Sequence, residues 1–263
     1  MRDLQPILSE SRQLIKQVAT FLTQESETFD KDVVELKGLN DLVSYVDKAA
    51  EKTLVDGLRK ILPEAGFITE EGTATNIEKD FNWIIDPLDG TTNFIHGLPV
   101  FAVSVALTYR KKTVMGIVHE ANRDECFYAM AGEEAYCNDK KIAVSCTEKL
   151  EESLLATGFP YYNFNEMEAY LKLLEQFMQK THGLRRMGSA AVDLAYVACG
   201  RFEGFFEYNL NSWDVAAGAF IVQQAGGKVT DFTGGDNYVF GREIVAGNAC
   251  HTEILDVIQK LWK

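Results

Sequence analysis

An apolar run in the first half of the chain ends in a group of oxygen-bearing side chains. The run leads into Asp86, Pro87, Leu88, Asp89, Gly90 and Thr91. Pro87 prevents a regular helix between the two aspartates, and Gly90 lets the backbone turn with its amide N–H groups exposed. Two carboxylates directly after an apolar strand repel each other unless a cation or hydrogen-bond donors compensate them. Because Mg²⁺ prefers oxygen ligands and shares its positions with substrate phosphates, we predict a metal-dependent enzyme that acts on phosphates.

Two further stretches place an acid beside small residues. Glu70 precedes Glu71 and Gly72 after a short apolar segment, and Asp214 stands at the start of a run that reads Val-Ala-Ala-Gly. Taken alone, each acid has an ordinary explanation, because Asp214 could cap a helix and Glu70 could be a solvated turn residue. Their chemical meaning depends on whether the fold brings them to the aspartate pair.

Taken together, these stretches resemble the inositol monophosphatase family of metal-dependent, lithium-sensitive phosphatases. The segment from Trp83 to Phe94 fits the first signature of that family throughout. The segment from Asn211 to Gly218, followed by an Ala-Gly-Gly at 225–227, fits the second. Two long motifs in the correct order are more specific than one short pattern, and the resemblance extends over nearly the whole chain.

The resemblance implies a centre of two or three Mg²⁺ ions. Asp86 would bridge two ions, Glu70 and the carbonyl of Leu88 would complete the first site, and Asp89 and Asp214 would complete the second. Glu70 would also contact a third ion that binds more weakly, and for this reason we include Glu70 among the catalytic residues. Paired metals of this kind acidify a water and stabilise the leaving oxygen of an in-line displacement.

The resemblance also implies roles around the metals. Asp47 and Thr91 would orient and deprotonate the attacking water, and the amides of Gly90 and Thr91 would bind phosphate oxygens at the start of a short helix. The positions implied for the alcohol part of the substrate are Gly188, Ser189, Ala190 and Glu207. Two of them keep structural alternatives, since Ser189 could be only a helix N-cap and Glu207 only a charge on an edge strand.

The substrate itself stays open, because the motifs recognise phosphate and metal while the loops select the rest. We expect hydrolysis of a small anionic phosphomonoester, with inositol monophosphate as the first expectation. Relatives with these motifs also act on fructose 1,6-bisphosphate, on the 2′-phosphate of NADP or on 3′-phosphoadenosine nucleotides. A dual-specific enzyme is among these alternatives.

Readings outside this family fit the motif less well. Dehalogenase-like phosphatases use Asp-x-Asp and an aspartyl-phosphate, whereas the spacing here is Asp-x-x-Asp. A non-catalytic Ca²⁺ site is the alternative from another class, although the loop lacks the ligand register of an EF-hand. Kinase or nucleoside-triphosphatase activity is disfavoured because neither a Walker A loop nor a G-x-G-x-x-G fingerprint is present.

Composition limits the partners and the compartment. The chain has 263 residues and a formal net charge of −13, a field that repels nucleic acid polymers and anionic membranes. The N-terminus lacks the apolar core of a signal peptide, and no apolar run approaches the roughly 18 residues of a membrane span. We therefore expect a soluble, cytoplasmic protein. The five scattered cysteines suggest buried, reduced thiols, with neither a disulfide framework nor a zinc site.

Hydrophobic periodicity predicts the elements that must position these residues. In the first half we expect helices over about 4–25 and 46–61 and strands at 67–69 and 81–85. Further strands at 101–109, 114–119, 125–129 and 135–137 should form an antiparallel meander. In the second half we expect strands at 154–157, 202–206 and 244–246, and helices over 170–178, 190–199, 214–225 and 252–262.

These elements define an α/β fold of layered type. The family resemblance implies the sugar-phosphatase αβαβα sandwich, with an antiparallel sheet in the first half and a second α/β layer behind it. We expect an α+β half at 1–150, with Glu70 and the aspartate pair, joined to an α/β half at 151–263, with Asp214, as one integrated unit. A homodimer is a further expectation from the family.

Overall fold

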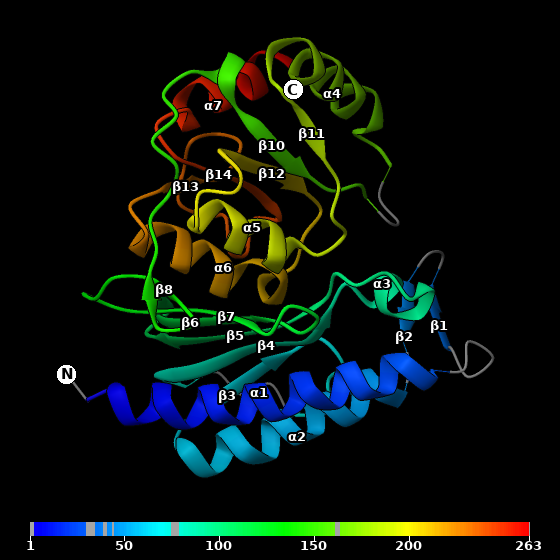
Figure 1. The fold of residues 1–263 in the computed structure, drawn as a ribbon, viewed down its shortest axis with the longest axis vertical. Coiled ribbons are helices and arrows are strands. Elements are labelled where there is room, and N and C mark those ends of the chain that lie inside the picture. The colour runs from blue at the N-terminus through cyan, green and yellow to red at the C-terminus, as the bar shows by residue number, and fades with distance from the viewer. Residues whose placement is uncertain are drawn as a thin grey trace.

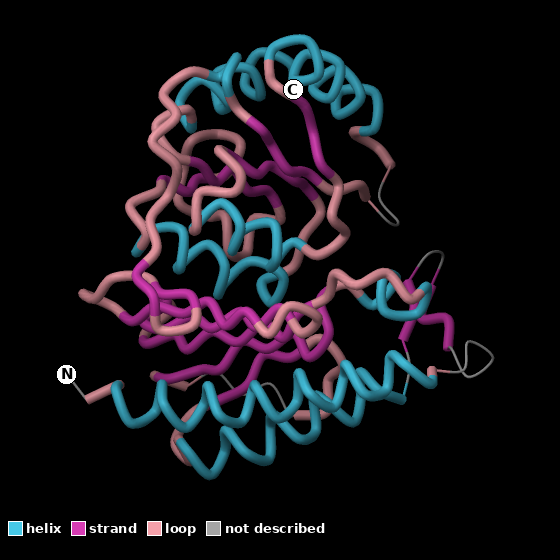
Figure 2. The backbone as a smooth tube through the Cα atoms, in the orientation of Figure 1, coloured by secondary structure: helices cyan, strands magenta, loops and turns pink. Residues whose placement is uncertain are grey.

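The computed structural model describes residues 3–29, 35–38, 41–43, 45–74, 79–160 and 164–262, which form five layers (Figure 1). One outer layer contains α1 (Gln5–Thr28) and α2 (Tyr45–Ile61), and the opposite one contains α4 (Met167–Lys180) and α7 (His251–Leu261). The middle layer consists of α5 (Ala190–Ala198) and α6 (Ser212–Gln224). A sheet separates the middle layer from each outer layer (Figure 2). The predicted αβαβα sandwich is confirmed.

The first sheet has the strand order β3-β4-β5-β6-β7-β8-β9. Its strands are β3 (Gly66–Thr69), β4 (Phe81–Asp89), β5 (Ala102–Tyr109), β6 (Lys112–Glu120), β7 (Glu125–Met130), β8 (Tyr136–Cys137) and β9 (Lys140–Lys141). From β4 to β9 the pairing is antiparallel, as predicted. The expectation of an antiparallel sheet is wrong at one edge, where β3 pairs parallel with β4. Both strands therefore run toward the same edge of the sheet, which brings Glu70 beside the end of β4.

The side chains of β4 alternate between two cores. Trp83 and Ile85 pack with the helices of the α1 and α2 layer, whereas Ile84 packs with the α5 and α6 layer. Successive residues of a strand point to opposite faces, so a strand covered on both faces becomes a continuous apolar run. This explains why the segment before the aspartates contains no polar alternation.

A bulge interrupts the pairing of β4 with β5. Asp86 lies opposite Ser104 and Asp89 lies opposite Ala102, so β4 uses three steps where β5 uses two. Residues three apart in a regular strand face opposite ways, and one extra residue cancels that difference. Pro87 suits this place because it cannot donate a ladder hydrogen bond. Both aspartates consequently face the α5 and α6 layer.

The second sheet has the strand order β11-β10-β12-β14-β13. Its strands are β10 (Leu154–Thr157), β11 (Gly183–Arg185), β12 (Gly204–Tyr208), β13 (Lys228–Thr230) and β14 (Glu243–Gly247). β10 pairs parallel with β11 and β12, whereas β14 is antiparallel to β12 and β13. The edge strands β11 and β13 were not predicted, because three residues are too few to show a period.

The remaining described elements are short: β1 (Glu35–Gly38), β2 (Asp41–Val43), α3 (Thr91–His96) and the 3₁₀ turn Leu150–Glu152. All five cysteines are free thiols, as predicted, but the expectation that they are buried is correct only for Cys126 and Cys250, since Cys146 is exposed and the other two are half-buried. Within the described residues, none of the helices combines the length and the apolar character that a bilayer crossing requires.

The middle layer joins the two halves of the chain. Its core contains Ile84 and Ala106 from the first half together with Phe205 and Ala246 from the second. Because the two halves share this core, we keep the division at residue 150 as a proposal about sequence organisation, with both halves in one folding unit.

Helix α6 lies unusually close to the first sheet. A Cβ atom added to Gly116 of β6 would come within 2.7 Å of the carbonyl oxygen of Ala217. On its other side, α6 contacts α5, where a Cβ added to Gly218 would come within 2.6 Å of the Cβ of Leu194. Small residues therefore let α6 fit between its neighbours, and the start of α6 is held at a fixed place over the end of β4.

We predict that Gly116→Ala lowers the free energy of unfolding by about 1–3 kcal/mol, because the new methyl group collides with backbone atoms that cannot turn away. Gly57→Ala is the matched control. The nearest atoms to its new Cβ are Cγ and the two methyl groups of Leu14, a flexible side chain that can rotate, and alanine favours a helix. Chemical denaturation of both variants provides the measurement. Equal stabilities for the two variants would contradict the close contact of α6 with the sheet.

Candidate functional site

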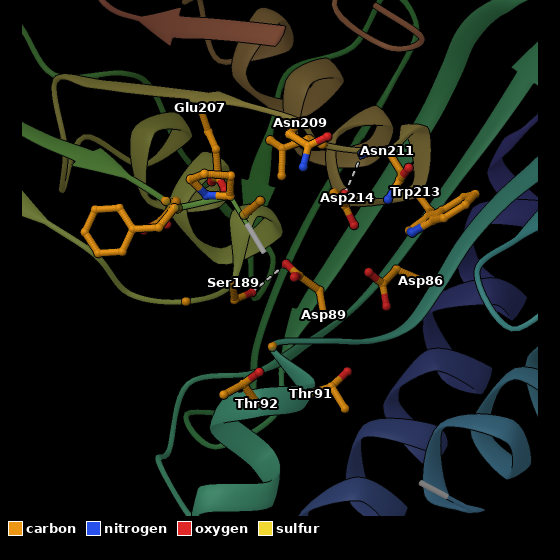
Figure 3. A pocket seen from close by; sticks show the side chains of 18 of the residues that line it. Asp86, Asp89, Thr91, Thr92, Ser189, Glu207, Asn209, Asn211, Trp213 and Asp214 are labelled. Carbon is orange, nitrogen blue, oxygen red and sulfur yellow. Dashed lines mark hydrogen bonds between the residues drawn. The ribbon is translucent and has the colours of Figure 1, made fainter. Parts of the chain in front are cut away.

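A cavity lies where the end of β4 meets the starts of α5 and α6 (Figure 3). Its lining includes, among the predicted site residues, Glu70, Asp86, Leu88, Asp89, Gly90, Thr91, Gly188, Ser189, Ala190, Glu207 and Asp214. Asp47 is the one predicted site residue outside this lining. Figure 3 shows Asp86, Asp89 and Asp214 directed toward the same space. The two halves of the chain thus contribute to one cavity.

Asp86 is the central carboxylate of the cavity. It is buried, and its Oδ1 accepts a hydrogen bond of 2.9 Å from the backbone N–H of Leu88 across the bulge. Burial, followed by the negative charges of Glu70, Asp89 and Asp214, raises the pKa of Asp86 well above its usual range. A buried acid with three acidic neighbours is stabilised in its ionised form only by positive charge or by hydrogen-bond donors.

Asp89 is held by the start of α5. Its Oδ2 accepts hydrogen bonds from the hydroxyl of Ser189 and from the backbone N–H of Ala191, both at 2.6 Å. Burial raises the pKa of Asp89 to about 6, although these donors act in the opposite direction. Ser189 also caps α5 by accepting from the N–H of Val192. Ser189 is therefore an N-cap, as one alternative held, and in addition it orients Asp89.

Asp214 lies in the first turn of α6. Its Oδ2 accepts a 2.6 Å hydrogen bond from the backbone N–H of Asn211, the residue that precedes the helix. Arg242 donates to the side-chain oxygens of Asn211 and Asn209, which fixes the loop before the helix. Burial and then the charge of Asp89 raise the pKa of Asp214 to about 7. Asp214 thus caps its helix and also contributes to the acidic cavity.

Glu70 reaches the cavity through a turn that is supported by α2. The backbone N–H of Glu70 donates to the carbonyl of Ile85 at 3.3 Å. In the same turn, the backbone N–H groups of Glu71 and Thr73 donate to the buried carboxylate of Glu51 in α2, at 2.7 and 2.8 Å. Sequence reasoning missed Glu51. A charged residue on the apolar face of an otherwise amphipathic helix was the available signal.

The composition of this cluster suits a hard divalent cation. The cluster consists of the carboxylates of Glu70, Asp86, Asp89 and Asp214 together with the carbonyl of Leu88. Carboxylate and carbonyl oxygens are the ligand types that Mg²⁺ takes. Among the described residues, no three acidic, imidazole or thiol groups converge closely enough to hold one ion as they stand. The negative charges of Glu70, Asp89 and Asp214 nevertheless all raise the pKa of Asp86, which places the four groups around one space.

Thr91 connects the cavity to Asp47. The hydroxyl of Thr91 lies 3.1 Å from Oδ1 of Asp47 and 3.0 Å from the carbonyl of Leu88, and it can donate to only one of them at a time. Asp47 belongs to α2 and is buried. The predicted pair of Asp47 and Thr91 is therefore brought together, with Thr91 on the cavity side.

Two glycines that line the cavity allow segments to approach each other there. Gly90 has φ +99°, and a Cβ there would come within 3.0 Å of the carbonyl of Val100. Gly188 has φ +91°, and a Cβ there would come within 2.8 Å of the side chain of Asn93. Asn93 in turn donates to the carbonyls of Val100 and Met187, at 2.7 and 2.8 Å. These contacts tie α3 to the segment that leads into α5.

Glu207 lies on the opposite side of the cavity from α3, as Figure 3 shows. It belongs to β12, which lies between β10 and β14, so the alternative of an edge-strand charge is wrong. Burial raises its pKa well above the usual range. Its carboxyl group lies against Gly158, where an added Cβ would come within 2.1 Å of it. Gly158 was missed by sequence reasoning and leaves the space that Glu207 occupies.

Arg186 and Asp193 also line the cavity and were not predicted. Arg186 brings positive charge to this acidic space, which counteracts the raised pKa values of Asp89 and Glu207. Its neighbour Phe159 places an aromatic ring 5.7 Å from the guanidinium. The signal for Arg186 was its position two residues before Gly188, which by itself does not distinguish a surface residue from a cavity residue.

Comparisons with known proteins agree with this architecture. The model of the inositol monophosphatase family matches residues 3–263. The protein named Nus factor SuhB from Escherichia coli K12 is 42% identical over 246 residues, which cover 93% of this chain and 92% of the relative. Among solved structures, the extragenic suppressor protein suhB from Bartonella henselae has a TM-score of 0.91 at 39% identity, with 97% and 98% of the two chains covered. The inositol monophosphatase from Anabaena has a TM-score of 0.87 at 31% identity, with 99% and 98% covered.

We predict that Mg²⁺ raises the melting temperature of the EDTA-treated protein, because an ion that binds only the folded chain stabilises it by about 2.7 kcal/mol at 100 times its Kd. For a chain of this size that corresponds to roughly 5–10 °C. Asp86→Asn removes one buried charge and keeps an acceptor for Leu88. The metal-free variant should therefore melt higher than the metal-free wild type and gain little from Mg²⁺.

Glu203→Gln is the control for this experiment, since Glu203 is a buried acid outside the cavity that accepts from the N–H of Leu154. It should lower the melting temperature without changing the Mg²⁺-induced increase. Equal increases in the wild type and in Asp86→Asn would show that the ion binds elsewhere.

Proposed function

This chain belongs to the inositol monophosphatase family, and we propose on that basis that it hydrolyses a small phosphomonoester with the help of Mg²⁺. The family and its structural neighbours support a metal-dependent phosphatase in general. The observation that carries the proposal is that the acids of β4 share one buried cavity with Asp214 at the start of α6. Inositol monophosphate is the substrate that we propose first.

The metal ligands that we propose follow the two groups of acids. Glu70, Asp86 and the carbonyl of Leu88 would hold one ion, and Asp86, Asp89 and Asp214 would hold a second. Glu70 would also contact a third. Bound Mg²⁺ would supply positive charge that polarises the phosphate and makes a nearby water more acidic. The hydrogen bonds from Ser189 and Ala191 keep Asp89 turned toward this place without an ion.

Thr91 and Asp47 are the proposed path for the proton of the attacking water. The hydroxyl of Thr91 would accept a hydrogen bond from that water while it donates to Asp47, which is 3.1 Å away. Asp47 is shielded from bulk solvent. A positioned base of this kind contributes roughly 10²–10⁴-fold to a rate.

The substrate would lie between α3 and β12. The amides of Gly90 and Thr91 would bind phosphate oxygens, since the chain turns there into α3 with φ +99° at Gly90. Glu207 would contact hydroxyl groups of the alcohol part. Gly188 and Ala190, together with the capping residue Ser189, remain proposed contacts at the start of α5.

Other substrates remain alternatives on the same site. These are NADP 2′-phosphate, fructose 1,6-bisphosphate and 3′-phosphoadenosine nucleotides.

The name Nus factor, which the Escherichia coli relative carries, favours a second candidate function as a member of a Nus assembly. A non-catalytic metal-binding protein is the third class. From the family we also propose inhibition by Li⁺, a homodimer and a cytoplasmic location.

A phosphate-release panel tests the proposal. We expect Mg²⁺-dependent release that is fastest with inositol monophosphate, slower with the three alternative phosphates, and reduced by Li⁺. A faster release from one of the alternatives would replace inositol monophosphate as the substrate. If no phosphate is released from any of them with Mg²⁺, the enzymatic proposal fails and the binding functions take its place.

We predict that Asp47→Asn and Asp89→Asn slow turnover for different reasons. Asp47→Asn removes the proton acceptor, so kcat should fall by about 10²-fold or more while the Mg²⁺ dependence stays as in the wild type. Asp89→Asn removes a metal ligand, so turnover should fall by orders of magnitude and the required Mg²⁺ concentration should rise. Steady-state kinetics at several Mg²⁺ concentrations, with circular dichroism as a check of folding, separates the two. Near-wild-type activity of Asp89→Asn at saturating Mg²⁺ would contradict the metal assignment.

A further inference from the structure

Asp193 is an unusual residue for its position. It lies in α5, whose nine residues from Ala190 to Ala198 are all buried, and it carries the only charge among them. Its side chain is on the wall of the cavity that contains the proposed metal ligands. An acid in a helix surrounded on all sides by protein requires a reason, because burial of a carboxylate is unfavourable.

The hydrogen bonds of the fold do not account for the whole carboxyl group of Asp193. The residue is 1% exposed, and within the part of the chain that the structure describes its Oδ1 makes no hydrogen bond. Several buried acids outside the cavity accept hydrogen bonds that hold the fold. Asp231, for example, accepts from the backbone N–H groups of Thr233 and Gly235, at 2.9 and 2.8 Å. An unsatisfied buried acceptor destabilises the folded chain.

The charges around Asp193 indicate what could bind there. Burial and the negative charges of Glu207 and Asp89 raise its pKa well above the usual range, and the positive charge of Arg186 opposes them. Two acids on this side of the cavity would repel a second phosphate group. A neutral hydroxyl group suits them, because it can donate to one carboxyl oxygen and accept from a protonated one.

We propose that Asp193 binds a hydroxyl group of the substrate's alcohol part, next to the hydroxyl contacted by Glu207. This inference rests on the proposed phosphatase function and makes it more specific. Asp193 would then help to determine which hydroxyl pattern of the alcohol part the cavity accepts.

A structural role makes a different prediction. If Asp193 served only to hold Arg186 in place by charge, its loss would affect every phosphomonoester in the same way. If Asp193 contacts a hydroxyl group, its loss affects only substrates that have a hydroxyl group at that position. The ratio of kcat/KM between two substrates therefore separates the two roles.

The test uses the full chain with Mg²⁺ and two substrates, inositol 1-phosphate and p-nitrophenyl phosphate, whose aryl group has no hydroxyl. The variants are Asp193→Ala and Asp193→Leu, which remove the polar group, and Asp193→Asn, which keeps hydrogen-bonding atoms in the same shape. Both apolar variants should fold with a melting temperature no lower than that of the wild type, because they remove an unpaired buried carboxyl. If one of them does not fold, the other carries the test.

We expect the preference for inositol 1-phosphate over p-nitrophenyl phosphate, expressed as the kcat/KM ratio, to fall at least about tenfold in Asp193→Ala and Asp193→Leu. The loss should be mainly in the KM for inositol 1-phosphate. Asp193→Asn should restore the ratio to within about threefold of the wild type. Asp231→Asn, the control at a buried aspartate outside the cavity, should leave the ratio unchanged.

An unchanged ratio in both apolar variants would overturn the role of Asp193 while the proposed function stands. Failure of the wild type to hydrolyse either substrate would instead overturn the proposed function, and the inference with it. A third result would also contradict hydrogen bonding to a neutral hydroxyl group. In that result the kcat/KM ratio is as low in Asp193→Asn as in the two apolar variants.

Discussion

The extra residue in β4 is the constraint on which the site depends. Without the bulge opposite β5, Asp86 and Asp89 would face opposite sides of the sheet, and one of them would point into the apolar core beneath α1 and α2. With the bulge, both face the middle layer. The consequence is a concentration of negative charge that must be compensated by donors from α5 and, in our proposal, by cations.

The second half of the chain supplies the compensation and completes the site. The start of α5 donates two hydrogen bonds to Asp89, while α6 adds Asp214 from the other side. Their positions follow from backbone packing, since Gly116 lets α6 approach the first sheet and Gly218 lets it approach α5. A glycine also makes room for Glu207 in the cavity, because the carboxyl group of Glu207 occupies the place that a side chain on Gly158 would take. Residues without side chains thus determine where the charged ones stand.

The acids and the hydroxyl group of the site could be predicted from the sequence, whereas the features that arise from packing could not. The acids of the two motifs were found because they follow apolar segments, and Thr91 and Asp47 do lie within hydrogen-bonding distance. The bulge could not be read from the sequence, since it depends on the register with β5. The second role of Ser189, the interior position of β12 and the short strands β11 and β13 likewise depend on contacts between segments far apart in the chain. The available signal for Asp193 was its position as a single charged residue in an apolar helix. Hydrophobic periodicity alone would place such a residue on the surface.

The position of the cavity between the first sheet and the middle layer also bears on how the chain is held together. An ion shared by Asp86 and Asp214 would connect two points that are separated by about half of the polypeptide, and would do so without a covalent bond. Such a connection acts like a removable crosslink, whose benefit comes from restricting the unfolded chain and grows slowly with the length of the closed loop. The acids that repel one another in the metal-free protein would then become the link between its halves. A chain with −13 net charge and no disulfide would in this way obtain a long-range connection from the same ions that serve its chemistry.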